Sequence, residues 1–326
     1  MSNVAFRTAI RDALDEELAA DERVILFGED IAVAGGVFAT TTGLYDKYGA
    51  ERVFDTPISE LALTGAAFGS AVTGLRPVIE IMFGDFLTLA MDSLVNQATK
   101  YWFLTQEQVS VPLTIRSVVG AGGRFGAIHS QMPASWFMGV PGIKIVAPST
   151  PADAKALLKA AVRDDNPVLF FEHKSLYPTK GEVPDGEIVD TLGSAKIVRP
   201  GKDATILALA LMVPRALQAA ERLKSEHGID AEVIDVRSLV PLDTQTIMGS
   251  VGRTHRLFTV EENPRLCGWG AEIVSIVADE AFYDLDGPPV RITTPHIPLP
   301  AADILEDLAL PSAERIAERV RRSLES

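Results

Sequence analysis

Residues 143–172 read IKIVAPSTPADAKALLKAAVRDDNPVLFFE, and they give the clearest indication of the fold class. It contains an apolar strand pattern at 143–147, a helical pattern that begins at Pro151, and a second apolar strand pattern at 167–172. Proline is favourable in the first turn of a helix, because the N–H that it lacks would have no partner there. The helix has one apolar face, formed by Ala154, Leu157, Leu158 and Ala161. A strand, a helix and a strand in this order are typical of a parallel sheet covered by helices.

The same alternation extends along the whole chain. In the first half, further strand patterns occur at 23–27, 77–81 and 112–119, and helical patterns at 59–73 and 85–100. In the second half, strand patterns occur at 205–211, 231–236, 257–260 and 290–294, with a helix that runs through Glu221 and another at 270–281. We therefore predict an α/β protein with mostly parallel sheets and two domains. The first covers residues 1–185, and a polar linker at 186–202 leads to a smaller domain at 203–326.

The composition argues against several classes of protein. The 326 residues carry 44 acidic and 30 basic side chains, a formal net charge of -14, which would repel nucleic acids and anionic membranes. The longest apolar run, Ala204 to Val213, is about half as long as a membrane span. Acidic residues near the N-terminus do not fit a transit peptide, and a single cysteine, Cys267, indicates a reducing compartment. We expect a cytoplasmic protein that binds neither membranes nor nucleic acids.

The glycine-rich stretch at 120–126 follows a predicted strand, so it has to be tested as a dinucleotide-binding loop. The pattern fails, because Phe125 stands where the fingerprint requires its third glycine. His129 ends this loop among small and polar residues, where an imidazole either takes part in catalysis or makes only local contacts. The five histidines of the chain lack the short spacings of zinc sites.

Residues 55–60 read DTPISE and place Glu60 where a strand is expected to lead into a helix. Ser59 is suited to cap that helix. An acid at this position stabilises the helix dipole by about 0.3–1 kcal/mol and needs no other role. The residues alone therefore do not decide whether Glu60 only stabilises the helix or is a functional carboxylate.

Several short segments, in chain order, resemble the beta subunits of the thiamine-diphosphate-dependent 2-oxoacid dehydrogenases, which belong to the transketolase-like superfamily. In the first half these are 28–30 (GED), 35–38 (GGVF), 43–49, 55–60, 120–131 and 161–168 (AVRDDNPV). In the second half they are 235–239 (DVRSL), 241–243 (PLD), 260–262 (VEE) and 268–273. Each segment is a weak signal alone, whereas the ordered combination is specific and covers almost the whole chain.

The resemblance implies thiamine diphosphate as the cofactor. The aminopyrimidine of this cofactor removes a proton from the thiazolium carbon only in its imino form, which requires a carboxylate at the pyrimidine ring nitrogen. Glu60 matches that carboxylate and is therefore a predicted catalytic residue. His129 is the second predicted catalytic residue, because it matches a family histidine at the mouth of the active site. The predicted cofactor-binding residues are Glu29, Ile58, Glu60, Met82 and Phe86. Of these, Ile58, Met82 and Phe86 match the apolar seat of the pyrimidine.

The resemblance also implies two metal ions. Residues 161–166 match a loop that encloses a structural potassium ion in related proteins, although an ordinary helix-to-strand turn explains this loop nearly as well. The candidate potassium ligands are Leu113, Ala161, Asp164 and Asn166. The family holds magnesium through a motif that begins Gly-Asp-Gly, and no such sequence occurs in the chain. We therefore expect an alpha subunit to hold the magnesium and to supply half of the active site.

The implied protein is the beta subunit of a pyruvate dehydrogenase. It would decarboxylate a small 2-oxoacid and transfer the acyl group to the lipoyl domain of a dihydrolipoyl acyltransferase core, in a heterotetramer of two alpha and two beta chains. Acetoin and branched-chain 2-oxoacids are alternative substrates, since residues 138–140 (MGV) depart from the family pattern near the substrate entrance. The less favoured alternatives are a split transketolase, a cofactor-free scaffold and a nucleotide-binding electron-transfer subunit.

Overall fold

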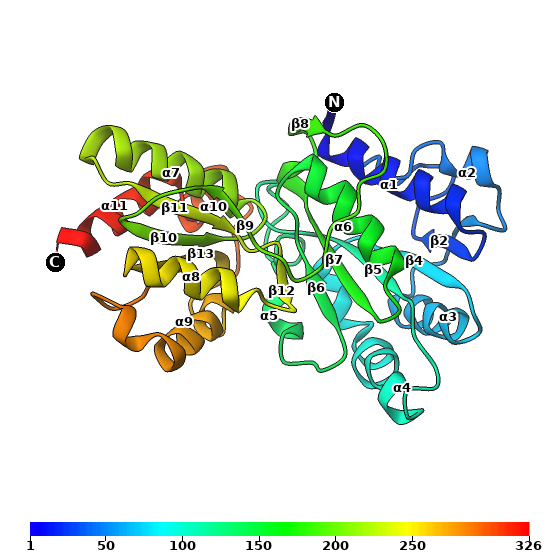
Figure 1. The fold of residues 1–326 in the computed structure, drawn as a ribbon. Coiled ribbons are helices and arrows are strands. Elements are labelled where there is room, and N and C mark those ends of the chain that lie inside the picture. Colours follow the sequence, from blue (N-terminus) through cyan, green and yellow to red (C-terminus); the bar gives the residue numbers. More distant parts are fainter. Residues whose placement is uncertain (326) are drawn as a thin grey trace. The chain divides into compact units, whose positions relative to one another are not determined.

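The computed structural model describes residues 1–325, and the contacts among them form two compact units (Figure 1). The first unit consists of residues 1–119 and 136–192, and the second of residues 120–135 together with the chain from 193 onward. The segment 120–135 differs from the expectation, which placed it in the first domain. It groups with the second unit because its backbone bonds to residues far along the chain, including Glu262 and Glu306. Within the described residues, no helix is both long and apolar enough to cross a bilayer.

A parallel sheet forms the middle of the first unit, with its strands in the order β6-β7-β5-β4-β2-β3. The strands are β2 (Val24–Gly28), β3 (Val53–Asp55), β4 (Arg76–Ile81), β5 (Thr114–Val119), β6 (Lys144–Val146) and β7 (Val168–His173). Strands β2, β5 and β7 are buried along their whole length, as expected for strands covered on both faces. A separate antiparallel pair joins β1 (Ser2–Ala5) to β8 (Lys180–Val183). The predicted α/β fold with a mostly parallel sheet is confirmed.

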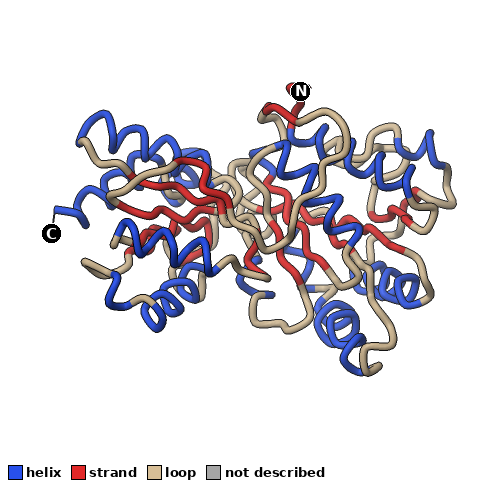
Figure 2. Tube along the Cα trace, viewed as in Figure 1, coloured by secondary structure: helices blue, strands red, loops and turns tan. Residues whose placement is uncertain are grey.

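Helices cover both faces of this sheet (Figure 1, Figure 2). On one face lie α1 (Phe6–Ala20) and α6 (Pro151–Arg163), and on the other α3 (Glu60–Val72) and α4 (Thr99–Leu104). The shorter elements are α2 (Leu44–Tyr48), the 3-10 helices η1 (Gly84–Thr88) and η3 (Lys174–Leu176), the π-helix η2 (Asp92–Ala98) and α5 (Ala134–Phe137). The last of these covers the residues where the chain returns from the segment 120–135 to the first unit.

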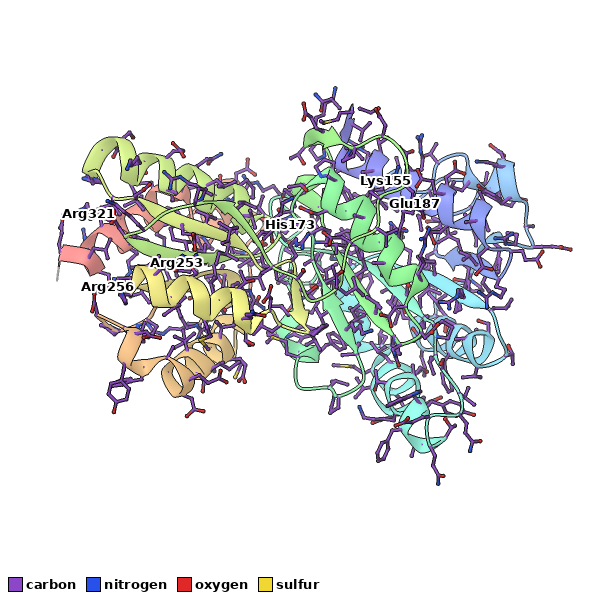
Figure 3. All side chains as sticks on the ribbon, in the orientation of Figure 1. Lys155, His173, Glu187, Arg253, Arg256 and Arg321 are labelled. Carbon is purple, nitrogen blue, oxygen red and sulfur yellow. The ribbon has the colours of Figure 1, made fainter. Side chains whose placement is uncertain are left out.

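Helix α6 begins at Pro151, as the sequence predicts. The Thr150 hydroxyl caps it by accepting a hydrogen bond from the amide of Asp153 at 3.1 Å. Lys155, labelled in Figure 3, and Lys159 reach across to Glu16 on α1, with nitrogen–oxygen distances of 2.5 and 2.6 Å. The two helices are therefore connected by charge as well as by apolar packing.

The helix predicted at 85–100 is broken into η1, η2 and α4. Within η2, the Asp92 carboxylate accepts hydrogen bonds from Asn96 and Gln97, each at 2.9 Å. These partners lie four and five residues further on, a spacing that suits the wide turn of a π-helix. Such turns occur often at functional sites, so this segment is relevant to the search for one.

The sheet of the second unit has the order β14-β13-β10-β11-β9, parallel except for the edge strand β9. Its strands are β9 (Lys196–Arg199), β10 (Ala204–Ala208), β11 (Ala231–Asp235), β13 (Leu257–Pro264) and β14 (Val290–Thr294), and β12 (Ser238–Val240) follows β11 in the chain. The helices are α7 (Met212–His227), α8 (Thr244–Thr254), α9 (Trp269–Glu280), η4 (Phe282–Asp284), α10 (Asp303–Ala309) and α11 (Ala313–Glu325). Helices α7 and α11 cover one face of the sheet, and α8 and α9 cover the other (Figure 1).

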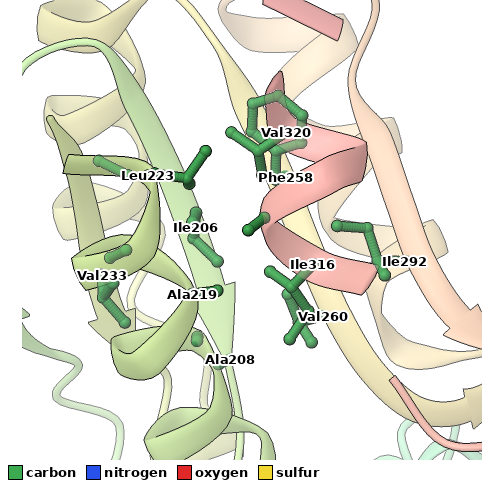
Figure 4. Close-up of a cluster of buried hydrophobic side chains, with 14 of the residues drawn as sticks. Ile206, Ala208, Ala219, Leu223, Val233, Phe258, Val260, Ile292, Ile316 and Val320 are labelled. Atoms are coloured by element: carbon green, nitrogen blue, oxygen red, sulfur yellow. The ribbon is translucent and has the colours of Figure 1, made fainter. Parts of the chain in front are cut away.

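The core of the second unit lies between its sheet and the helices α7 and α11 (Figure 4). Ile206, Val233 and Phe258 come from three strands of the sheet, and each is at most 1% exposed. They pack with Leu223 of α7 and Val320 of α11, which are fully buried. Burial of a side chain of this size contributes about 1.5–3 kcal/mol, so this cluster stabilises the unit independently of the first sheet.

Candidate active site

Three neighbouring parallel strands of the first unit, β4, β2 and β3, end at the same edge of the sheet. Gly28 at the end of β2 pairs with Asp55 at the end of β3, and the residue that follows it is Glu29. Met82 follows the last residue of β4. Ligands of open parallel sheets bind outside the carboxyl ends of the strands. The topology therefore brings predicted site residues from three separate segments to one edge.

Glu60 is the first residue of α3, and the segment before it is anchored to the sheet. The amide of Thr56 donates to the carbonyl of Gly28 at 2.9 Å, which ties the residues after β3 to the end of β2. Ser59 occupies the cap position of α3, but its side chain makes no capping bond, in contrast to the expectation. The Glu60 side chain turns inward and is only 6% exposed. A solvated, helix-stabilising acid would not be buried in this way.

Glu29 is buried beside Glu60, and its carboxyl has a raised pKa. It is 7% exposed, and it accepts a hydrogen bond from the backbone amide of Ser59. Burial raises the pKa of the Glu29 carboxyl, and the negative charges of Glu60 and Asp30 raise it further. Like charges brought together in a buried place are typical of functional sites.

Three polar atoms at this edge are buried and lack hydrogen-bond partners among residues 1–325. They are Glu29 Oε1, Thr56 Oγ1 and Thr64 Oγ1. Thr64 lies one turn after Glu60 on α3, so the two side chains share a face of the helix. Buried polar atoms are nearly always bonded, and exceptions need an explanation such as a water or a ligand. These three oxygens could therefore form hydrogen bonds with a ligand whose polar ring carries donors and acceptors.

The three apolar residues predicted to seat the pyrimidine differ in their burial. Phe86 is half-buried and packs edge to face against Phe83, with ring centroids 5.8 Å apart, and Met82 is also half-buried. Phe38 contacts the same Phe83 ring at 5.9 Å. Ile58 is different, because it is 82% exposed. Met82 and Phe86 thus offer an apolar wall, whereas Ile58 is exposed to an incoming ligand or partner.

The loop at 29–43 is held in place by hydrogen bonds between side chains and its backbone. The Thr41 hydroxyl donates to the carbonyl of Ile31 at 2.7 Å, and the amide of Ala32 donates to the Asp55 carboxylate at 2.8 Å. Gly35 has a positive φ of 76°, and a Cβ atom there would lie 2.8 Å from a side-chain oxygen of Thr42. The edge that carries Glu29 is therefore held by hydrogen bonds within the chain.

A buried charge network below this edge did not stand out in the sequence. The Arg116 guanidinium on β5 lies 2.7 Å from Glu80 on β4 and 2.6 Å from Glu172 on β7. The Tyr177 hydroxyl donates to Glu172 at 2.8 Å. Burial raises the pKa of the Glu172 carboxyl, while the Arg116 charge lowers it. A signal existed in the sequence, because each of three apolar strand patterns carries a charged residue.

His129, the second predicted catalytic residue, lies in the segment 120–135 of the second unit. Its side chain is partly buried, and its backbone amide donates to the carbonyl of Gly126 at 3.4 Å. The amide of Gly120 donates to the carbonyl of Gln131 at 2.9 Å, which closes the loop at its base. The imidazole is therefore carried by a closed and bonded loop.

The candidate potassium loop already has protein partners. The Asp164 carboxylate pairs with Lys144 and accepts a hydrogen bond from the amide of Asn166. The carbonyl of Ala161 accepts from the amide of Asp164, and that of Leu113 accepts from Val168. A cationic neighbour at Asp164 does not favour a further cation there. The potassium site stays a prediction.

The family "Transketolase, pyrimidine binding domain" matches residues 2–180, and "Transketolase, C-terminal domain" matches residues 193–316. The chain is 44% identical over 331 residues to the beta subunit of the acetoin:2,6-dichlorophenolindophenol oxidoreductase of Cupriavidus necator, covering 98% of this chain and 97% of that protein. It is 46% identical over 321 residues to a mitochondrial pyruvate dehydrogenase E1 component subunit beta-2 of Oryza sativa subsp. japonica, covering 97% and 85%. A solved "Split gene transketolase, inactive beta4 tetramer" shares the fold, with a TM-score of 0.80, 24% identity and 99% of both chains covered.

These matches define a transketolase-like protein in which a pyrimidine-binding domain precedes a C-terminal domain. The chain belongs to the family of the beta subunits of pyruvate and acetoin dehydrogenases within that superfamily. The predicted family is thereby confirmed, and the family implies thiamine diphosphate as the cofactor.

Proposed function

We propose that this chain is the beta subunit of a thiamine-diphosphate-dependent dehydrogenase that acts on pyruvate and passes the acetyl group to a lipoyl group. The observation that carries the proposal is the buried Glu60 carboxylate at the first residue of α3, beside the buried Glu29. The cofactor's ring requires such a carboxylate. The edge of the sheet provides it together with unbonded polar atoms and the half-buried Phe86.

Each residue of this edge then has a specific part. When bound, thiamine diphosphate supplies the nucleophilic carbon that adds to the carbonyl carbon of the 2-oxoacid. Glu60 holds a hydrogen bond at the pyrimidine ring nitrogen, and its burial strengthens that bond. Glu29, whose pKa is raised, keeps a proton to higher pH than an ordinary glutamate and limits the repulsion next to Glu60. Met82 and Phe86 would contact the ring and exclude water from it. His129 assists the transfer of the acyl group.

The proposed assembly is a heterotetramer of two alpha and two beta chains. The alpha subunit would hold the magnesium and the diphosphate, since no Gly-Asp-Gly sequence occurs in this chain. A dihydrolipoyl acyltransferase core would receive the acyl group through its lipoyl domain. We place this complex in the cytoplasm, although relatives of the chain include mitochondrial proteins.

Acetoin is the second candidate substrate, and a specific observation favours it. The relative from Cupriavidus necator is named for acetoin and matches this chain over 97% of its own length. Both substrates carry a carbonyl carbon that the same cofactor attacks, so the edge residues serve either reaction. The choice between them depends on groups outside Glu29 and Glu60.

The test is to copurify the chain with its candidate alpha subunit and to measure reduction of an artificial electron acceptor. Pyruvate, acetoin and branched-chain 2-oxoacids are offered in turn, with and without thiamine diphosphate and magnesium. We expect cofactor-dependent activity only in the mixture, highest with pyruvate. Activity highest with acetoin would replace the substrate and retain the class. Ketol transfer without any 2-oxoacid oxidation would overturn the proposal in favour of a split transketolase.

A further inference from the structure

We propose that Glu262, Asn263 and Glu306, all from the second unit, are positioning residues that hold the loop of His129 for acyl transfer. The inference rests on the proposed function and extends it. Glu262 and Glu306 accept hydrogen bonds from backbone amides before His129 in the chain, and Asn263 donates to a backbone carbonyl after it. The second unit would therefore act in the reaction through His129.

Two consecutive residues at the end of β13 hold the two ends of the loop. The Glu262 carboxylate accepts a hydrogen bond from the amide of Ala121 at 2.5 Å. The Asn263 side-chain amide donates to the carbonyl of Met132 at 2.6 Å and to the Ser135 hydroxyl at 3.3 Å. Glu262 and Asn263 are 7% and 3% exposed. Because the bonded positions lie on either side of His129 in the chain, the loop cannot shift without breaking buried hydrogen bonds.

Glu306 on α10 holds the middle of the glycine-rich stretch. One carboxylate oxygen accepts from the amide of Gly122 at 3.0 Å, and the other lies 2.6 Å from the guanidinium of Arg124. Arg124 also pairs with Asp303 and Asp307, at 3.0 and 2.9 Å. The Glu306 side chain is fully buried. A buried carboxylate that is bonded on both oxygens is costly to disturb, because one lost partner leaves the charge uncompensated.

Backbone strain at Arg124 agrees with this interpretation. Its φ is 61°, a left-handed conformation that residues other than glycine rarely adopt. Such strain persists only where the surroundings impose it, and it is common at sites that need a fixed geometry. The bonds from Glu306 and its two acidic neighbours provide that constraint. The imidazole of His129 thus belongs to a loop whose shape is determined by the second unit.

The test compares Arg124→Met with Arg253→Met, in the full chain assembled with its alpha subunit. Arg253, labelled on α8 in Figure 3, is the matched control, because it lies 2.7 Å from the buried Glu232 of the same unit and does not bond to the loop. We expect Arg124→Met and Asn263→Asp to lower kcat for acyl transfer to the lipoyl group about ten- to a hundredfold, since small misplacements of catalytic groups have effects of that size. The KM for the 2-oxoacid should change little, and Arg253→Met should retain the wild-type rate.

A double-mutant cycle with His129→Ala tests whether the effect passes through His129. In that background, Arg124→Met and Asn263→Asp should lower the rate little further, because residues that act as a unit are not additive. The same fold-change in both backgrounds would overturn the proposal. Hydrogen exchange gives a readout apart from activity, since the amides of Ala121 and Gly122 should exchange faster in both variants but not in Arg253→Met. If hydrogen exchange at Ala121 and Gly122 were unchanged in both variants, the loop-holding role would be overturned, whatever the activity of the wild-type complex. An inactive wild-type complex would instead count against the proposed function.

Discussion

The first unit contains two pairs of buried glutamates, and the pairs differ in what balances their charge. Glu80 and Glu172 both bond to Arg116, which lies between them on the middle strand. Glu29 and Glu60 lie at the carboxyl edge, where the next neighbour that affects Glu29 is the acidic Asp30. The first pair offsets its burial through a shared cation, whereas the second pair keeps like charges together.

The difference indicates where a ligand is needed. A buried charge is expensive, and the chain offsets that cost at Arg116 with three charge-assisted hydrogen bonds. At the edge, burial raises the pKa of Glu29, and the nearby hydroxyl oxygens of Thr56 and Thr64 have no partners within the described chain. Water or a ligand would complete these contacts. We therefore propose that the unbalanced pair serves the function and the balanced pair the fold.

The strongest test of this contrast is Glu60→Gln. We expect activity of the complex to fall by about 10²- to 10⁴-fold, since the carboxylate that acts on the pyrimidine ring is lost. Stability should hold or rise, because a like charge beside Glu29 is removed. Steady-state rates with the alpha subunit and urea unfolding of the chain provide the two measurements. Glu17→Gln is the control, because Glu17 is also buried but pairs with Arg163 on the structural helix α6. Near-normal turnover in Glu60→Gln would remove the catalytic role.

Arg116→Met should give the converse result, with a large effect on stability. Breaking a buried ion pair by removing one partner costs about 3–5 kcal/mol, because Glu80 and Glu172 would remain buried without their cation. Urea unfolding at neutral pH measures the loss. Adding Glu80→Gln and Glu172→Gln should recover part of it, since the uncompensated charges are then absent. If the triple variant were no more stable than Arg116→Met, charge balance would not explain the network.

The sequence predicts the local elements of this contrast better than its long-range contacts. Helix α6 follows from Pro151 and its apolar spacing, and Glu60 is correctly expected at the start of a helix. The missing Ser59 cap and the break in the helix at 85–100 depend on neighbours that spacing does not reveal. Likewise, the bond from Glu262 to Ala121 spans 141 residues, so no local pattern assigns the histidine loop to the second unit.

Glu29→Gln should reveal the like-charge repulsion as a pH dependence. Because the folded pKa of Glu29 lies above its ordinary value of 4.5, the native state holds the proton to higher pH than the unfolded state does. The wild-type chain therefore loses stability as pH rises through this window, and the variant does not. The difference in unfolding free energy should be near zero below the ordinary value and should favour the variant increasingly at higher pH. Urea titrations at several pH values measure it, and a difference that does not vary with pH would contradict the assigned cause.

Asp21→Asn should have the smallest effect on stability, because this carboxylate pairs with Arg23 near the surface. The Arg23 side chain lies 2.7 Å away and is the main cause that lowers the pKa of Asp21 to about 2. The pair therefore stabilises the fold above the ordinary value of 3.8, and this contribution is lost as pH falls toward 2. The Arg23 and Asp21 side chains are 55% and 26% exposed, so solvent screens the pair and the expected cost at neutral pH is under about 1 kcal/mol. Urea unfolding of Asp21→Asn and the wild type at pH 7 and at pH 3 gives the loss of unfolding free energy at each pH. If the loss at pH 7 were as large as that of Arg116→Met, burial would not explain the difference between structural and surface charges.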